Sequence, residues 1–139
     1  MFNIIRPIIF KFSPEVAHSL AIKALKLNNI SYTKPKGSQV LETTFCEKKL
    51  SSPIGVAAGF DKNAEVYNPL FNLGFGFVEV GTITPKPQFG NPKPRVFRLE
   101  EDEALINRLG FNNSGSEEIS RRIRENDKKG LLGINIGPN

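Results

Sequence analysis

Residues 54–63 read Ile-Gly-Val-Ala-Ala-Gly-Phe-Asp-Lys-Asn, a short apolar run that ends at a glycine and is followed by a charged pair. The apolar part, residues 54–58, is continuous rather than alternating, which predicts a strand buried on both faces. Gly59 can adopt a positive φ or let a ligand approach the main chain. In parallel α/β folds, functional side chains gather at the carboxyl ends of the strands. We therefore expect Asp61 and Lys62 to face a site at that edge.

Two further apolar segments, residues 77–81 and 131–136, predict buried strands of the same sheet. The first of these segments ends at a glycine, and polar residues follow it at once. Because the carboxyl ends of parallel strands meet at one edge, polar groups from all three strands should converge there. The side chains expected at this edge are Asp61, Lys62, Asn63, Thr82, Thr84 and Asn135.

Helices are expected between these strands. Asn68-Pro69 should begin the first one, because asparagine is a good cap and proline suits the first helical position, and Gly74 should end it. A second helix is expected from about residue 117 to residue 129, capped by Ser114 or Ser116 and ended by the following glycine. The order strand, helix, strand, helix, strand predicts an α/β fold with a parallel sheet and right-handed crossovers.

The N-terminal residues predict a helical pair. Residues 1–12 are rich in Phe and Ile, and Ser13-Pro14-Glu15 is a helix start that predicts a helix from residue 14 to about residue 27. This helix is amphipathic, and docking on a core or lying in a membrane interface are both compatible with its pattern. The apolar opening is far shorter than the roughly 20 residues of a membrane span. Residues 28–37 are polar with proline and glycine, so we expect a linker and a boundary near residue 37.

The remaining segments predict smaller elements. Residues 40–45 and 48–50 should form short antiparallel strands. Four prolines between residues 85 and 94 exclude a regular element there. Residues 95–99 alternate in polarity like an edge strand, and the acidic run at 100–103 should be a solvated turn.

Composition excludes several classes of protein. The 39% hydrophobic and 24% charged content is that of a globular chain. A net charge of +5 would attract phosphates, anionic lipid or nucleic acid, although an excess of this size more commonly means a solvated basic face. One histidine, His18, and one cysteine, Cys46, exclude a multi-ligand zinc site. The single cysteine indicates a reducing compartment and is expected to be a buried structural thiol.

Four segments together carry a specific resemblance: residues 57–62, 79–88, 90–99 and 107–113. In order and spacing they closely resemble the quinone-dependent, class 2 dihydroorotate dehydrogenases. The resemblance implies an oxidoreductase with flavin mononucleotide (FMN) on a (β/α)8 TIM barrel, preceded by an amphipathic helical pair. Such an enzyme oxidises (S)-dihydroorotate to orotate in the synthesis of UMP and passes the electrons to ubiquinone or menaquinone. On this view residues 1–37 form the membrane and quinone-tunnel segment, and residues 38–139 begin the FMN-binding barrel.

The resemblance also implies roles for individual residues. The implied FMN-binding positions are Ala58, Gly59, Phe60, Asp61, Lys62, Thr82 and Asn135. The implied substrate-binding positions are Lys62, Asn107, Arg108, Leu109, Gly110 and Phe111. His18 and Arg98 are the implied contacts of the quinone head group. No metal and no nucleic acid are expected, and the resemblance implies a monomer on the cytoplasmic face of a bacterial inner membrane.

Two departures from the family are visible. An eightfold barrel takes about 250 residues, whereas three barrel strands are expected here, and the family's serine base would lie beyond Asn139. After residues 135–137 the family continues with a lysine, where this chain has Pro138. We therefore expect an N-terminal fragment that is inactive alone.

Two alternatives remain open. A flavin barrel of the soluble dihydroorotate dehydrogenase class would lack the helical pair and would use a cysteine base. The segment from Ser13 to His18 argues against it, as does the place of Cys46 ahead of the first barrel strand. The second alternative is a non-catalytic basic module that binds anionic lipid or nucleic acid, in which Lys62 is an ordinary surface lysine.

Overall fold

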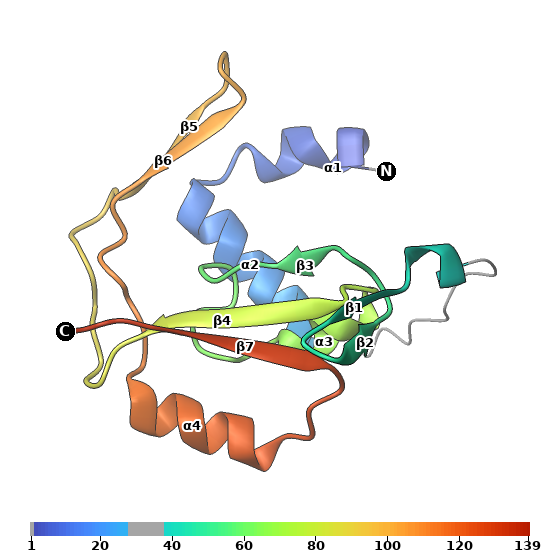
Figure 1. The fold of residues 1–139 in the computed structure, drawn as a ribbon. Helices are drawn as coiled ribbons and strands as arrows, with labels where there is room; N and C mark the ends of the chain where they lie inside the picture. The colour runs from blue at the N-terminus through green and yellow to red at the C-terminus, as the bar shows by residue number, and fades with distance from the viewer. Residues whose placement is uncertain (1, 28–37) are drawn as a thin grey trace.

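A three-stranded parallel sheet in the order β3-β4-β7 lies at the centre of the fold (Figure 1). The computed structural model describes residues 2–27 and 38–139. The strands are β3 (Gly55–Val56), β4 (Phe77–Ile83) and β7 (Leu131–Ile136). Their parallel order with intervening helices confirms the predicted α/β class.

The burial of the two outer strands differs from the prediction. In β4, alternate residues such as Val78 and Val80 are fully buried. The expected buried strand at 54–58 is only the two-residue β3, and its neighbour Ile54 is 65% exposed. In β7, Ile136 is 79% exposed. Both outer strands have one partner in the described sheet, so their burial on two faces was wrongly predicted. The central strand also continues past the glycine that was expected to end it, so that Thr82 lies within β4.

The hydrophobic core lies between β4 and the two crossover helices, α3 (Tyr67–Asn72) and α4 (Ser116–Glu125). Ile119 on α4 and Val66 before α3 are completely buried in it. Truncating a buried isoleucine to alanine typically costs about 2–5 kcal/mol, so α4 is held to the sheet mainly by such contacts. The core residues are Ala64, Val66, Tyr67, Leu70, Val78, Val80, Ile83, Ile119 and Ile123.

The start of α3 was wrongly predicted. The helix begins at Tyr67, and no side chain caps it. Asn68, the expected cap, instead donates from Nδ2 to the Asp127 carbonyl at 2.6 Å and accepts from the Lys129 amide at 3.3 Å. This asparagine therefore joins α3 to the segment that follows α4. The end of α3 agrees with the prediction, because Gly74 follows it with a φ of 99°.

The capping of α4 also differs from the prediction. Gly115, with a φ of 83°, is its N-cap residue, and no side chain caps it. Ser116 donates from Oγ to the Pro85 carbonyl at 3.1 Å, so its hydroxyl holds the proline-rich loop. The helix ends at Glu125, four residues before the predicted end, because Asn126 is extended.

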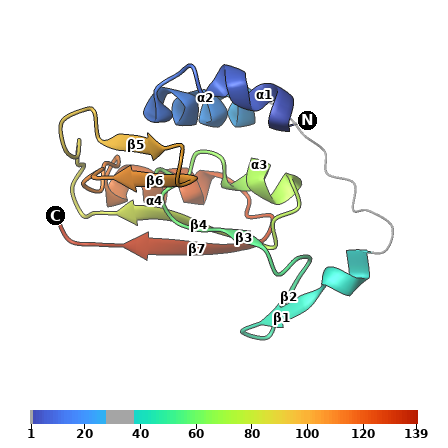
Figure 2. The same ribbon diagram turned by 90° about the horizontal axis from the view of Figure 1, so that it is seen from above.

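Two helices lie on the side of the sheet away from β7: α1 (Phe2–Ile9) and α2 (Pro14–Leu27) (Figures 1 and 2). The bounds of α2 are those predicted. None of the helices among the described residues is long and apolar enough to cross a membrane. The predicted linker and boundary fall on residues 28–37, outside the described ranges.

Two antiparallel hairpins complete the fold. The first, β1 (Thr43–Phe45) with β2 (Lys48–Leu50), confirms the predicted antiparallel pair. The predicted start of its first strand at residue 40 was wrong, because the short helix η1 (Ser38–Leu41) occupies that position. The turn of this hairpin contains Cys46, which is exposed, so the expected burial of this thiol was wrong.

The second hairpin pairs β5 (Val96–Leu99) with β6 (Ala104–Asn107) and projects from the sheet toward α1 (Figure 1). The acidic residues 100–103 form its exposed turn, as predicted. Strand β6 was not predicted from the sequence.

Candidate functional site

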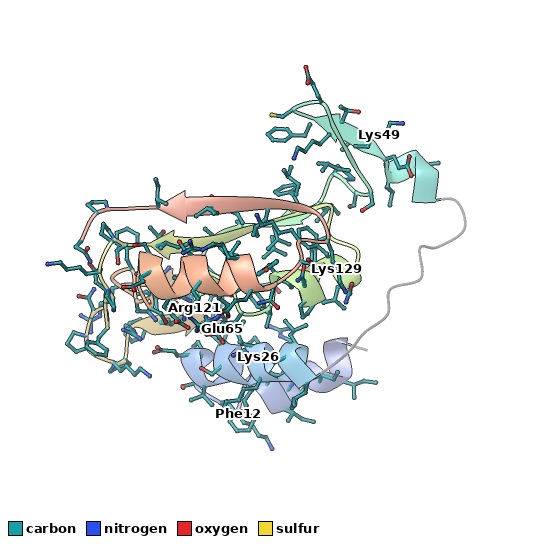
Figure 3. The ribbon with its side chains drawn as sticks, turned by 90° about the horizontal axis from the view of Figure 1, so that it is seen from below. Phe12, Lys26, Lys49, Glu65, Arg121 and Lys129 are labelled. Atoms are coloured by element: carbon teal, nitrogen blue, oxygen red, sulfur yellow. The ribbon has the colours of Figure 1, made fainter. Side chains whose placement is uncertain are left out.

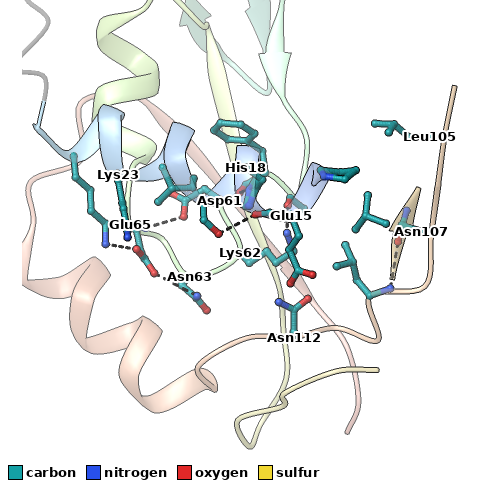
Figure 4. A pocket seen from close by; sticks show the side chains of 18 of the residues that line it. Glu15, His18, Lys23, Asp61, Lys62, Asn63, Glu65, Leu105, Asn107 and Asn112 are labelled. Carbon is teal, nitrogen blue, oxygen red and sulfur yellow. Dashed lines mark hydrogen bonds and ion pairs between the residues drawn. The ribbon is translucent and has the colours of Figure 1, made fainter. Parts of the chain in front are cut away.

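A cleft of about 680 Å³ opens between α2, the loop after β3 and the β5–β6 hairpin (Figure 4). Its walls therefore come from three segments that are far apart in the sequence. Nine of the candidate site residues predicted from the sequence line it: His18, Gly59, Phe60, Asp61, Lys62, Asn63, Arg98, Asn107 and Leu109.

Glu15 and Arg95 fasten α2 to this cleft. The Arg95 side chain is 7% exposed and donates from Nη2 to Glu15 Oε1 at 2.6 Å. Its Nη1 donates to the carbonyls of Phe89 and Asn91 at 2.6 and 3.0 Å. The hydrogen bond from Arg95 holds the pKa of Glu15 below its usual value. One buried guanidinium thus joins α2 to the proline-rich loop.

A second ion pair lies at the other end of α2. Lys26 of α2 pairs with Glu65, which Figure 3 shows facing each other. Burial acts to raise the pKa of Glu65, but the hydrogen bond and charge of Lys26, together with the Arg122 charge and the Asn63 hydrogen bond, lower the pKa overall. Both ends of α2 are therefore held to the body of the fold by charged contacts.

Asp61 shapes the loop after β3 rather than projecting into the cleft. Its two carboxylate oxygens accept hydrogen bonds from the amides of Glu65 and Val66 at 2.8 and 2.7 Å. The residue is 1% exposed, and its burial raises the pKa of the carboxyl group. The loop is also tied to β4, because the Gly59 amide donates to the Gly81 carbonyl at 2.8 Å. Asp61 lines the cleft, but its acceptors bind the main chain.

Lys62 brings a positive charge to the cleft wall. Its Nζ donates to the Gly59 carbonyl at 2.7 Å. Burial lowers the pKa of its ammonium group. At Gly59 itself the φ is +107°, and an added Cβ would meet nothing within 4 Å. The main chain beside the lysine is therefore open to a flat group lying against it.

His18 and Arg98, the predicted quinone contacts, line the same cleft. His18 Nε2 lies 2.7 Å from the Phe60 carbonyl, which as an acceptor requires the proton on that nitrogen. Burial lowers the pKa of the His18 ring. Arg98 donates from Nη1 to the Phe12 carbonyl at 2.8 Å and stacks over the Phe10 ring at 4.5 Å. Arg98 thus connects the hairpin to the end of α1.

A separate polar cluster joins the three strands of the sheet. Thr82 donates from Oγ1 to Asn135 Oδ1 at 2.7 Å, and Asn135 donates from Nδ2 to Glu79 Oε1 at 3.1 Å. The Ala58 amide donates to Glu79 Oε2 at 3.4 Å. Thr82 and Asn135 are therefore brought together as predicted. Glu79 was not predicted as part of this cluster, although an acidic residue inside the apolar segment 77–81 was a signal for it.

Other predicted residues serve the loops or lie elsewhere. Thr84 Oγ1 donates to the Lys86 carbonyl at 2.6 Å, and Asn63 Oδ1 accepts from the Ser114 amide at 2.9 Å. Arg108 donates to the Pro94 carbonyl at 3.2 Å, and Phe111 is 54% exposed. Arg108, Gly110 and Phe111 are not among the residues that line the cleft.

A group of three or more residues suited to bind a metal ion is absent from the described part of the chain. Near the open main chain at Gly59, the cleft wall includes Lys62, His18 and Arg98. These groups suit an anionic or carbonyl-bearing organic ligand rather than a metal.

Comparison with known proteins gives consistent matches. Residues 40–139 match the family described as dihydroorotate dehydrogenase. A Rhodospirillum rubrum protein named dihydroorotate dehydrogenase (quinone) is 51% identical over 133 residues, which make up 96% of this chain and 36% of that protein. An Erythrobacter litoralis protein of the same name is 50% identical over 140 residues, covering 100% of this chain and 40% of that protein. The chain thus spans little more than a third of these relatives.

Solved structures agree with this match. Ligand-free DHODH from Eimeria tenella superimposes with a TM-score of 0.83 at 42% identity, over 91% of this chain and 38% of that one. The structure of the Eimeria tenella protein with ferulenol gives a TM-score of 0.82 at the same identity, over 91% of this chain and 36% of that one. The chain therefore belongs to the dihydroorotate dehydrogenase family.

Proposed function

We propose that residues 1–139 form the quinone-facing part of an enzyme that oxidises (S)-dihydroorotate to orotate with FMN and a membrane quinone. The observation that carries the proposal is the cleft in which His18, Lys62 and Arg98 meet beside the open main chain at Gly59. The names of the relatives, which include the word quinone, support the choice of electron acceptor.

The residues present fit a flavin. The open space at Gly59 suits a flat ring against the main chain, while Lys62, Thr82 and Asn135 supply polar groups. When bound, FMN would accept the hydride equivalent of the substrate and release electrons to the quinone. The Lys62 ammonium would stabilise negative charge on the ring or on the orotate carboxylate. The segment from Asn107 to Phe111 would complete the substrate side.

We place the quinone in the cleft between α2 and the β5–β6 hairpin, with His18 and Arg98 at its head group. Apolar side chains on the adjoining helices support a peripheral site on a membrane: Ile4 is 77% exposed, Ile8 59% and Leu20 45%. Such a face would bind at the lipid surface, here proposed as the cytoplasmic face of the inner membrane. We propose a monomer.

We further propose that β3, β4 and β7 are the first three strands of a TIM barrel. Their parallel pairing and intervening helices support this, as do the exposed Ile134 and Ile136 on β7, which a further layer would cover. On this proposal the substrate base and the FMN phosphate site come from other barrel strands.

The test uses a full-length chimera, in which residues 1–139 replace the matching part of the Rhodospirillum rubrum relative. We expect dihydroorotate-dependent reduction of a quinone and little reduction of fumarate or a nicotinamide. Lys62→Met should lower kcat/KM at least 100-fold, which corresponds to about 2.7 kcal/mol. The matched control is Lys49→Met, because Lys49 projects from the β1–β2 hairpin (Figure 3) and is exposed. Equal turnover by the two variants would refute the site.

A further inference from the structure

Glu79 is an acidic residue in the middle of the central strand. It is half-buried, and it lies between Val78 and Val80, whose side chains are fully buried on the opposite face. Its two oxygens accept from two different strands, through the Asn135 side chain on β7 and the Ala58 amide after β3. No ion pair to Glu79 is found within residues 2–27 and 38–139. Its acceptors are therefore matched by neutral N–H donors.

The hydrogen-bond chemistry of these groups fixes which one donates and which one accepts at each contact of the cluster. A carboxylate offers acceptors and no donor, so Asn135 must turn its NH2 group toward Glu79. The carbonyl oxygen of Asn135 is then left facing Thr82, which donates its hydroxyl hydrogen there at 2.7 Å. A threonine hydroxyl has one hydrogen. Because that hydrogen is used on Asn135, Thr82 can offer a further partner only its lone pairs.

We propose that Glu79 is a positioning residue that makes Thr82 an obligate hydrogen-bond acceptor toward the cofactor. The inference rests on the proposed function, in which Ala58, Thr82 and Asn135 border the flavin. The group of the ring that faces Thr82 is on this account an N–H donor, and a carbonyl placed there would be rejected. Glu79 acts through Asn135 and Thr82 and does not itself contact the ring.

Replacing Glu79 by glutamine keeps the shape of the side chain and reverses the order of donors and acceptors from residue 79 to Thr82. The Ala58 amide still needs an acceptor, so the glutamine would keep its oxygen there and turn its NH2 group toward Asn135, whose amide would then rotate by half a turn. Thr82 would then accept from Asn135 and could spend its own hydrogen on the ring. The Thr82 hydrogen would then face the N–H group of the ring, and two donors facing each other at the flavin edge would weaken binding.

The experiment measures FMN affinity and the flavin absorption spectrum of the full-length chimera after removal and re-addition of FMN. Glu79→Gln should weaken FMN binding about tenfold and shift the visible absorption bands. Thr82→Val should weaken it by a similar factor. The double variant should be no weaker than Thr82→Val alone, because both changes interrupt one chain of hydrogen bonds. Glu101→Gln, in the exposed β5–β6 turn, is the matched control and should bind FMN normally.

The outcomes separate this inference from the proposed function. A parent chimera that binds no FMN would refute both. Normal FMN binding by the parent together with unchanged binding and spectrum in Glu79→Gln would overturn the role of Glu79 alone. Losses that multiply in the double variant would overturn it too, because they would show independent effects. If Glu79→Gln does not fold, Asn135→Ala breaks the same chain, and normal FMN affinity in that variant would refute the inference.

Discussion

Replacing Arg95 by methionine should release α2 from the cleft. Methionine keeps the apolar stem but removes the donors to Glu15, Phe89 and Asn91. Breaking a buried ion pair by removing one partner costs about 3–5 kcal/mol. The Glu15 side chain is 21% exposed, so water recovers part of that loss. We therefore expect the free energy for opening α2 to fall by about 2–4 kcal/mol.

Lys93→Met is the matched control for this change. Lys93 Nζ lies 3.5 Å from the same Glu15 Oε1, but its side chain is 69% exposed. Exposed ion pairs of this kind contribute about 0.2–1 kcal/mol. Each variant thus removes one cation from the Glu15 carboxylate, and the two cations differ chiefly in how deeply they are buried.

Native-state hydrogen exchange of the full-length chimera measures the effect directly. Amides of α2 report its local opening, and amides of β4 serve as the internal reference. Exchange in α2 should rise about 30- to 1000-fold in Arg95→Met, and less than about fivefold in Lys93→Met. Equal changes in the two variants, or a change in Arg95→Met confined to β4, would refute the reasoning. Because Arg95 lowers the pKa of Glu15, the parent should also lose α2 protection as pH falls below about 4.5, and Arg95→Met should lose this dependence.

Two further changes test other contacts of the site. The folded pKa of His18 is lowered by burial, so below about pH 6.5 the open state of α2 binds the extra proton more readily and docking weakens until the folded pKa is passed. Melting of the chimera between pH 8 and pH 5 should show this decline, and His18→Gln should flatten it; an unchanged slope would contradict the assignment. Asp61→Ala leaves the buried Glu65 and Val66 amides without their acceptor and should cost about 2–4 kcal/mol in urea unfolding. A cost below about 1 kcal/mol would show that water replaces the carboxylate.

Where a helix or strand is determined by residues close together in the sequence, the sequence predicted it correctly. Ser13-Pro14-Glu15 placed the start of α2 correctly, and the polarity of residues 95–99 identified β5. Asn68 carries an equally good capping signal, yet its side chain bonds to Asp127, 59 residues away. A single sequence contains no sign of that partner, so the cap was wrongly assigned.

In the site, too, the sequence predicted some contacts and could not predict those that depend on distant residues or on the folded loop. The sequence predicted that Thr82 and Asn135 would meet, because strand ends in a parallel sheet converge. It could not distinguish Asp61, whose oxygens bind its own loop, from Lys62, which lines the cleft beside it. Both are charged residues after a strand, and only the folded loop separates their roles. The predicted burial of β3 and β7 was wrong for a related reason. The burial of a strand depends on how many strands lie on either side of it.

The link between Glu15 and Arg95 has a consequence for synthesis of the chain. These residues are 80 positions apart. At about 5–20 residues per second, roughly 4–16 s pass between the synthesis of Glu15 in α2 and the synthesis of Arg95. During that interval the apolar side chains of α1 and α2 leave the ribosome before Arg95 exists to hold them. The two helices are therefore made and released without the Arg95 anchor, so their docking on the cleft has to follow the synthesis of the proline-rich loop.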